Sequence, residues 1–406
     1  MGDSSKLLGR AWARLIADPR WRRLVTSETY QDLREFVTLP AWEGYTLTPR
    51  RLANLYLLRL EHRLGRTQLR SRPVKLTVEA TNICNLRCPG CFTGVGEVGR
   101  ARSHMSLDFY RTLLDELSPT LLELEFYNWG EPLLAKHLTA MIADASARGI
   151  STTVSTNFSL PFDAERAERL VSSGLTVLGV SLDGARQETY AQYRVRGDFD
   201  LVLKNCALVR DAKRRLGQTR PRVVWEFHVF PHNVGDIAQA RAMAADLEMD
   251  IAVTQGWMIG GDWDGGGAIE PQIPQPYRCP FLWGVAVVNN DGGVAPCCGT
   301  FYQDDDCGKL ATAAGDSGAH DFAGLWNTAQ FARKRRFFRA RSGNDEERQD
   351  VCFECPTTRL YEDFQRHRAA GGGRADYHVP ISMNDAPTYF RQRRPPAAAT
   401  LPRRSA

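Results

Sequence analysis

The sequence lacks two features that would direct the chain into or across a membrane. No run of about 18 apolar residues occurs in the 406 residues, so no transmembrane helix is expected. Lys6, Arg10 and Arg14 interrupt the first apolar positions, so no signal peptide is expected either. We therefore expect a cytoplasmic protein whose ten cysteines serve as metal ligands and not as disulfide partners.

A large excess of charge of one sign is also absent, although the charge is unevenly placed. The net charge is +5, but residues 1–75 hold 15 Lys and Arg against 7 Asp and Glu, and residues 391–406 hold five Arg and no acid. Basic segments of this kind can touch nucleic acid or an acidic carrier, but a solvated surface is the simpler interpretation. Nucleic acid is therefore not an expected partner.

Short apolar runs alternate with amphipathic stretches between residues 74 and 257. This alternation is typical of repeated βα units with parallel strands, and hence of an α/β fold. Residues 5–70 carry apolar side chains at helical spacing and predict an N-terminal helical extension. The expected strands span residues 75–80, 121–127, 151–156, 176–182, 223–230 and 251–255.

Cys84, Cys88 and Cys91 follow the first expected strand with the spacing CxxxCxxC. Three thiolates can hold three irons of a cubane [4Fe-4S] cluster and leave the fourth iron open to a small molecule. Zinc and an accidental triplet are the alternatives. A structural zinc site normally has four protein ligands, and no further Cys or His follows within ten residues. The spacing therefore favours an iron–sulfur cluster.

This spacing resembles that of the radical S-adenosylmethionine (radical SAM) superfamily. Gly90 stands where the family usually has an aromatic residue, and Phe92 follows the third cysteine. The resemblance implies that SAM chelates the open iron and is cleaved to methionine and a 5′-deoxyadenosyl radical, which abstracts hydrogen from a substrate. It also implies a partial (β/α)6 barrel, which matches the six expected strands. Function in such folds lies at the carboxyl ends of the strands, where the cysteine loop is expected.

Gly130, Glu131 and Pro132 come at the end of the second expected strand and resemble the GGEP motif of the family, with Trp129 in place of the first glycine. By that resemblance the backbone of this segment meets the amino group of SAM. Glycine permits close approach of a backbone, and proline fixes the turn. After a CxxxCxxC loop, this triplet is a strong indication of SAM binding.

Three other residues are candidates for SAM binding. Ser181 and Arg194 resemble the family residues that contact the SAM carboxylate, and the planar guanidinium of arginine suits a carboxylate. An ordinary strand-end turn and a surface arginine are the alternatives. Asn157, which follows the third expected strand, is a candidate for the ribose or methionine region.

Strand alternation predicts which side chains face the interior of the barrel. Leu122, Leu124 and Phe126 are expected to pack on helices, whereas Glu123, Glu125 and Tyr127 point the other way. Gly179, Ser181 and Asp183 share a face of the fourth strand. Glu226 and His228 share a face of the fifth, opposite Trp225, Phe227 and Val229. Glu226 and His228 are candidates for a catalytic base, and a buried structural pair is the alternative.

A second set of cysteines follows a linker at residues 260–276. An Asp-Gly turn between two strand-like runs predicts a hairpin that brings Cys279 and Cys297 together, and a helix over residues 322–338 leads to Cys352 and Cys355. These four can close a four-thiolate site for zinc. Their order resembles the SPASM and twitch auxiliary-cluster domains of radical SAM enzymes, which implies one auxiliary [4Fe-4S] cluster. Cys298 and Cys307 are possible further ligands, and Cys206 is expected in the core.

These observations predict four regions. Residues 1–73 are a helical extension, residues 74–259 the radical SAM core, residues 260–370 the auxiliary-cluster domain, and residues 371–406 a loop-rich, disordered tail.

The resemblance predicts a radical SAM oxidoreductase that acts on a small molecule. The expected substrate is a carbohydrate-like alcohol in a biosynthetic pathway, and the expected electron donor is a flavodoxin or ferredoxin. A peptide maturase or epimerase, a non-catalytic iron–sulfur electron carrier and a zinc-binding module are the alternatives. SAM binding and visible iron–sulfur absorption would separate the enzyme from the last two.

Overall fold

The computed structural model describes residues 39–40, 43–256, 279–312, 321–340, 351–352, 355 and 370. Its contacts divide the chain after Trp42 into two units, and almost all described residues belong to the second. The expected linker at 260–276, the tail at 371–406 and most of the helical extension lie outside the described residues. The four predicted regions therefore stay predictions. Within the described part, no helix is both long enough and apolar enough to cross a membrane.

A nine-stranded sheet organises the second unit, in the order β6-β5-β4-β3-β2-β1-β7-β8-β9. All pairings from β6 to β1 are parallel, so the six expected strands are confirmed. Register is continuous across them, as where Ser155 pairs with Gly179 and Ser181 with Glu226. The strands are β1 (Lys75–Val78), β2 (Glu123–Phe126), β3 (Ser151–Thr156), β4 (Val177–Ser181), β5 (Arg222–Val229) and β6 (Asp250–Gln255).

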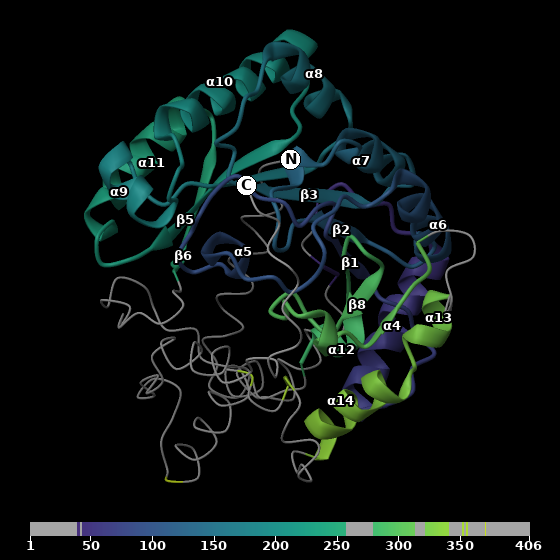
Figure 1. Cartoon of the computed structure of the whole chain (residues 1–406). Helices are drawn as coiled ribbons and strands as arrows, with labels where there is room; N and C mark the ends of the chain where they lie inside the picture. Colours follow the sequence, from purple (N-terminus) through teal and green to yellow (C-terminus); the bar gives the residue numbers. More distant parts are fainter. Residues whose placement is uncertain are drawn as a thin grey trace, which may run out of the picture. The chain divides into compact units, whose positions relative to one another are not determined.

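Helices connect these strands and cover one side of the sheet (Figure 1). Ser106, Asp163 and Asp198 start three of them by accepting a hydrogen bond from a backbone N–H of the first turn. The helices are α5 (Phe92–Val95), α6 (Leu107–Leu117), α7 (Leu138–Ala147), α8 (Ala164–Ser172), α9 (Gln187–Tyr193), α10 (Phe199–Leu216) and α11 (Ile237–Asp246), with short turns η1 (Pro132–Leu134) and η2 (Val234–Asp236).

The two faces of the parallel strands differ in polarity, as strand alternation predicts. Leu124, Phe126, Trp225 and Phe227 are fully buried in the main hydrophobic core, which the helices complete. On the other face, the side chains of neighbouring strands form hydrogen bonds and ion pairs, among them Lys75 with Glu123 and Glu125, and Ser155 and Ser181 with Glu226. The inward face is therefore polar.

The C-terminal region extends the same sheet. β7 (Val285–Val288) pairs parallel with β1, and β8 (Gly293–Ala295) and β9 (Gly308–Lys309) follow in antiparallel pairings. The expected hairpin is thus confirmed, with Gly292 at a positive φ of 85° in its turn. The other elements here are α12 (Phe281–Gly284), η3 (Gln303–Asp305), α13 (Phe322–Leu325) and α14 (Ala329–Ala340).

The single helix expected over residues 322–338 was wrong, because α13 and α14 are separated at residues 326–328. Tertiary hydrogen bonds explain the break. The Asn327 side chain accepts from the Leu69 N–H at 2.8 Å and donates to the Leu69 carbonyl at 2.9 Å. The buried Arg335 guanidinium donates to the Trp326 carbonyl at 2.8 Å. The Trp326 carbonyl would pair internally in a continuous helix, and the Asn327 side chain holds the break against Leu69.

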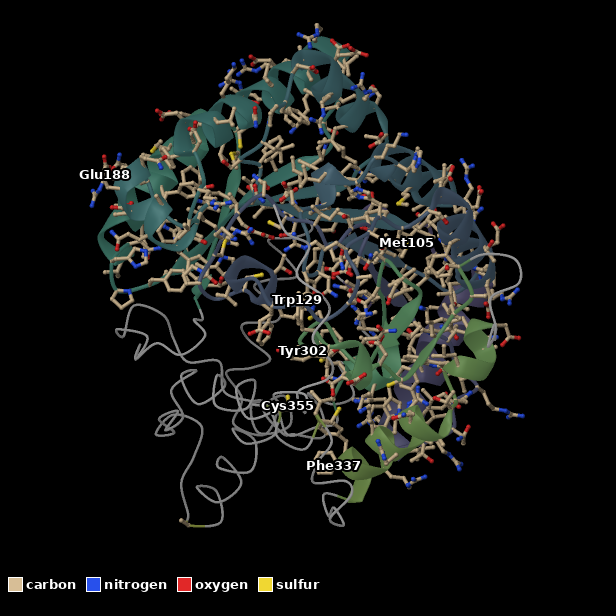
Figure 2. The ribbon with its side chains drawn as sticks, viewed as in Figure 1. Met105, Trp129, Glu188, Tyr302, Phe337 and Cys355 are labelled. Carbon is tan, nitrogen blue, oxygen red and sulfur yellow. The ribbon has the colours of Figure 1, made fainter. Side chains whose placement is uncertain are left out.

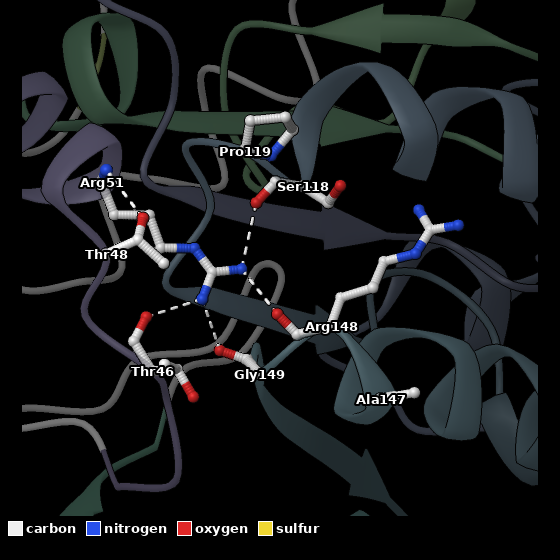
Figure 3. Close-up of a pocket in the computed structure, with 8 residues that line it drawn as sticks. All are labelled: Thr46, Thr48, Arg51, Ser118, Pro119, Ala147, Arg148 and Gly149. Atoms are coloured by element: carbon white, nitrogen blue, oxygen red, sulfur yellow. Dashed lines mark hydrogen bonds between the residues drawn. The ribbon is translucent and has the colours of Figure 1, made fainter.

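Helix α4 (Pro49–Leu64) is the described part of the expected helical extension. It ends before the expected residue 70 because Gly65 adopts a left-handed conformation. Arg51 of α4 is buried and donates to the carbonyls of Thr46, Ser118, Arg148 and Gly149 at 2.7 to 3.0 Å (Figure 3). The pocket around it, of about 430 Å³, is lined by these residues together with Thr48, Pro119 and Ala147. Arg51 therefore joins α4 to the ends of α6 and α7.

Candidate functional site

The loop after β1 brings Cys84, Cys88 and Cys91 together. All three pack in one apolar cluster with Leu86, Tyr193 and Phe230. Burial raises the pKa of Cys84 to about 12, and the nearby thiols of Cys88 and Cys91 add to this effect. Burial also raises the pKa of Cys88, against the Arg194 guanidinium, which lowers it. Such thiols ionise when a metal replaces their protons.

Hydrogen-bond donors surround two of these sulfurs. The Leu86 N–H lies 3.5 Å from Cys84 Sγ, and Asn157 Nδ2 lies 3.7 Å from the same atom. Arg194 Nη1 lies 4.0 Å from Cys88 Sγ. N–H donors and a cation stabilise thiolate sulfurs, so this donor set fits a [4Fe-4S] cluster held by three cysteines. Within the described residues, no group of three His, Cys, Asp or Glu side chains is arranged to hold a single metal ion.

The Gly130-Glu131-Pro132 turn packs directly on this loop. A Cβ at Gly130 would overlap the Thr81 carbonyl, and the Glu131 N–H donates to the Ile83 carbonyl at 2.9 Å. The buried Glu131 carboxylate accepts from Thr156 Oγ1 at 2.6 Å and from the Asn157 N–H at 2.7 Å. Its side chain thus joins the ends of β2 and β3, and the contact between the backbone of this turn and SAM stays a prediction.

Ser181 and Glu226 lie side by side on β4 and β5. Glu226 Oε2 accepts from Ser155 Oγ at 2.8 Å and from Ser181 Oγ at 3.3 Å. A Cβ at Gly179 would overlap the Glu226 carboxylate, so glycine makes room for this side chain. Contact between Ser181 and SAM stays a prediction.

Polar contacts link Cys88, Arg194, Asp183 and His228 in succession. Arg194 Nε donates to Asp183 Oδ2 at 2.6 Å, and the other oxygen of the fully buried Asp183 meets His228 Nδ1 at 2.9 Å. Burial acts to raise the pKa of Asp183, but the charge of Arg194 and the contacts with the ring and backbone of His228 prevail and lower it to about 2. The carboxylate is therefore ionised at neutral pH.

An aromatic cluster joins the first cysteine loop to the C-terminal region. Phe92, next to Cys91, stacks on Phe301 with ring centroids 5.1 Å apart and contacts Trp129 at 5.4 Å. Trp129 Nε1 donates to the Thr300 carbonyl at 2.8 Å. Tyr302 packs against the same cluster as Trp129 (both labelled in Figure 2). Trp129, which replaces a motif glycine, thus contacts both regions.

Cys279, Cys297 and Cys355 of the second set lie close together, with Cys298 beside them. Burial, and then the nearby thiols of Cys298, Cys279 and Cys355, raise the pKa of Cys297 well above its usual value. Cys352 is buried in the main core. Tyr127 forms a side-chain hydrogen bond with Cys298, and burial followed by the Cys298 thiol raises the pKa of Tyr127. Several thiols without disulfides fit an iron–sulfur cluster, and Cys298 joins the candidate ligands.

The remaining two cysteines lie in the core. Cys206 in α10 is buried as expected, and Cys307 is buried in the main hydrophobic cluster.

Sequence reasoning missed three parts of this site: the role of Asp183 as an ion-pair centre, the Tyr127–Cys298 contact and the bridging role of Trp129. Asp183 shares a strand face with Ser181, and this was the one available signal for it. Trp129 was visible only as a departure from the motif. No local pattern pointed to the Tyr127 contact.

Comparison with known families agrees with this geometry. Residues 78–229 match the radical SAM superfamily, and residues 279–356 match SPASM, an iron–sulfur cluster-binding domain. The chain therefore carries a radical SAM domain followed by a SPASM domain. The first domain implies a SAM-binding [4Fe-4S] cluster, and the second implies auxiliary iron–sulfur clusters.

Curated relatives match part of the chain. Fe-coproporphyrin III synthase of Methanosarcina barkeri is 34% identical over 31% of this chain and 32% of its own length. Mycofactocin maturase MftC of Mycobacterium ulcerans is 28% identical over 45% and 47%. PqqA peptide cyclase of Bradyrhizobium diazoefficiens is 27% identical over 52% and 53%. The chain thus spans between a third and about half the length of these relatives.

Two solved structures are also similar. Streptococcus suis SuiB has a TM-score of 0.49 at 14% identity, covering 79% of this chain and 80% of that one. BtrN in complex with AdoMet and 2-DOIA has a TM-score of 0.43 at 19% identity, covering 70% and 94%.

Proposed function

We propose that this protein is an enzyme that cleaves SAM reductively and abstracts hydrogen from an organic substrate. The observation that carries this proposal is the position of Cys84, Cys88 and Cys91, packed against the Gly130–Pro132 turn and next to Arg194 at the carboxyl ends of parallel strands. A SAM-bound cluster supplies the 5′-deoxyadenosyl radical chemistry. The three cysteines would hold it, and the backbone of the turn, Asn157, Ser181 and Arg194 would orient SAM.

The finer proposal is dehydrogenation of a carbohydrate-like alcohol. It is supported by the polar inward face of the barrel, where Glu226 and His228 are candidate proton acceptors for a hydroxyl group. Cys279, Cys297, Cys352 and Cys355, with Cys298 as a further candidate, would hold one auxiliary cluster able to accept an electron. The proposed electron donor for SAM cleavage is a flavodoxin or ferredoxin.

Modification of a peptide is the second candidate. It is supported by two relatives, a mycofactocin maturase and a PqqA peptide cyclase, each of which matches about half of this chain. The two candidates differ in the size and class of the substrate. Product mass after incubation with each class therefore separates them.

Metal content and SAM cleavage test the main proposal. Anaerobically reconstituted protein is expected to bind about eight irons if two cubanes are present, and the triple variant Cys84→Ala, Cys88→Ala, Cys91→Ala about four. Reduced protein should release 5′-deoxyadenosine from SAM, and the triple variant should not. Cys206→Ala is the matched control, because Cys206 is a buried cysteine of α10 that belongs to neither set. Zinc at either set, or SAM cleavage by the triple variant, would contradict the proposal.

The auxiliary cysteines separate oxidation from redox-neutral chemistry. In a variant with Cys352→Ala and Cys355→Ala, oxidised product is expected to be lost. Deuterium from the substrate carbon should still reach 5′-deoxyadenosine, because that step depends on the first set. The comparison requires variants that stay soluble and keep the first cluster. Full product formation would instead support an epimerase or peptide modification.

A further inference from the structure

We infer that Asp183 is a positioning residue that holds His228 with its proton on Nδ1 and its lone pair on Nε2, which makes His228 the proton acceptor of the barrel interior. This inference rests on the proposed function for its chemical meaning, since a hydroxyl-bearing substrate needs such an acceptor. The orientation of the His228 ring follows from geometry alone and does not depend on the proposed function.

Asp183 is held from three sides. Its Oδ1 accepts from the backbone N–H of His228 at 2.8 Å and meets the ring Nδ1 at 2.9 Å. Its Oδ2 accepts from Arg194 Nε at 2.6 Å. Asn233 Nδ2 donates to the main-chain carbonyls of both Asp183 and His228, at 3.0 and 2.9 Å. These hydrogen bonds hold the end of β4 against the end of β5, with the Asp183 carboxylate between them.

This arrangement dictates the tautomer of His228. An ionised carboxylate accepts hydrogen bonds and donates none, so the Nδ1 atom facing Asp183 must carry a proton. In the neutral ring the other nitrogen, Nε2, then keeps its lone pair. The His228 side chain is 30% exposed, whereas that of Asp183 is 0% exposed. Of these two side chains, only the His228 ring is therefore accessible to a ligand.

Glu226 is less suited to the same task. It lies two residues earlier on the same strand face, and two hydroxyl groups, from Ser155 and Ser181, already donate to one of its oxygens. By contrast, the described residues provide no hydrogen-bond partner for His228 Nε2. Beyond Asp183 lies Arg194, and His232, after the end of β5, interacts with both Asp183 and Asp236.

Histidine nitrogen spectra test the inference directly. In anaerobic holoprotein labelled with ¹⁵N-histidine, His228 should show a protonated Nδ1 and an unprotonated Nε2, with its signals assigned by His228→Gln. In Asp183→Asn, the uncharged amide has a single oxygen, which cannot accept both from Arg194 Nε and from the His228 backbone N–H. The fixed preference for a proton on Nδ1 should therefore be lost, and both tautomers should appear. Asp200→Asn, a change at an exposed carboxylate of α10, should leave the natural pattern unchanged.

A chemical probe gives a second readout. Diethyl pyrocarbonate reacts with an accessible, unprotonated imidazole nitrogen, and peptide mass spectrometry locates the adduct. His228 should be modified in the natural protein and in Asp200→Asn, and this modification should be weaker in Asp183→Asn.

A wild-type ring with its proton on Nε2 would overturn the inference, even if Asp183→Asn does not fold. So would an unchanged pattern in a folded Asp183→Asn variant. Neither readout depends on SAM cleavage. A protein that fails to form 5′-deoxyadenosine but shows the expected tautomer would defeat the proposed function and leave the inference standing.

Discussion

At the scale of single residues, Gly130 shows how little space separates the turn after β2 from the cysteine loop. The glycine sits against the backbone of Thr81 and Asn82, and the next residue, Glu131, hydrogen-bonds to Ile83. Any side chain at position 130 would push the turn away from the loop that carries Cys84. Its lack of a side chain is therefore a requirement of packing as well as of close approach to a ligand.

We predict that Gly130→Ala weakens SAM binding and lowers the free energy of unfolding by about 2 to 4 kcal/mol, because the new Cβ overlaps main-chain atoms that cannot rotate away. Gly235→Ala is the matched control, since a Cβ there meets no atom within 4 Å. Thermal unfolding and equilibrium SAM binding, both under anaerobic conditions, measure the two effects. Equal stability and affinity in the two variants would refute this account of Gly130.

At the scale of elements, the Phe92, Trp129 and Phe301 cluster fastens the C-terminal hairpin to the radical SAM domain. We predict that Trp129→Leu costs about 3 kcal/mol of stability, because it removes an indole hydrogen bond and two ring contacts. Amide hydrogen exchange should become faster in β8 and β9 and stay unchanged in α8 and α10.

Val98→Ala provides the comparison for Trp129→Leu, since Val98 is 74% exposed and follows the same cysteine loop. Exchange that rises equally in all elements would mean that Trp129 supports the whole fold and not this one junction.

Much of the element order followed from the sequence, for a physical reason. The strands β1 to β6 and their inward faces were predicted because hydrophobic alternation is a local signal. The pairing of β7 with β1 and the break at Asn327 depend on contacts between distant segments, which no local pattern records. The same holds for the candidate site: Cys84, Cys88 and Cys91 were evident from spacing, whereas the Arg194–Asp183–His228 line requires three segments to be brought together in space.

At the scale of the whole molecule, a buried polar network joins the radical SAM domain to the SPASM region. Arg100 forms ion pairs with Asp291 and Asp306 of the C-terminal hairpin region, at 3.0 and 3.1 Å. Glu79, at the end of β1, accepts from the Trp129 N–H at 3.2 Å. Burial raises the pKa of Glu79 to about 7, although Arg100 and two backbone N–H groups act to lower it. This junction therefore responds to pH.

The sign of the response follows from proton linkage. The pKa of Glu79 in the folded protein, about 7, lies above its unfolded value of about 4.3, so the folded state binds more protons between these values. The contribution of Glu79 is fully present below about pH 4 and is lost as pH rises towards 7. We predict that the free energy of unfolding falls by about 3 kcal/mol across this window, and that Glu79→Gln removes this component.

Anaerobic unfolding of the natural protein and of Glu79→Gln, measured from pH 5 to pH 8, checks this prediction through the difference between the two proteins. Glu188→Gln is the control, because Glu188 is an exposed residue of α9 (Figure 2). A difference between the natural protein and Glu79→Gln that is independent of pH would contradict the assignment.

The pairing of β7 with β1 also bears on how the chain folds as it is synthesised. β1 is made early, yet the strand that covers its second edge, Val285–Val288, is made much later. Until then the N–H and C=O groups along that edge await a partner, and an open edge of this kind readily pairs with other chains. Contacts between residues so far apart in sequence also form slowly. A nascent chain that stops before β7 therefore leaves the strand that leads into its cysteine loop open to aggregation, and the arrival of the C-terminal hairpin closes that edge.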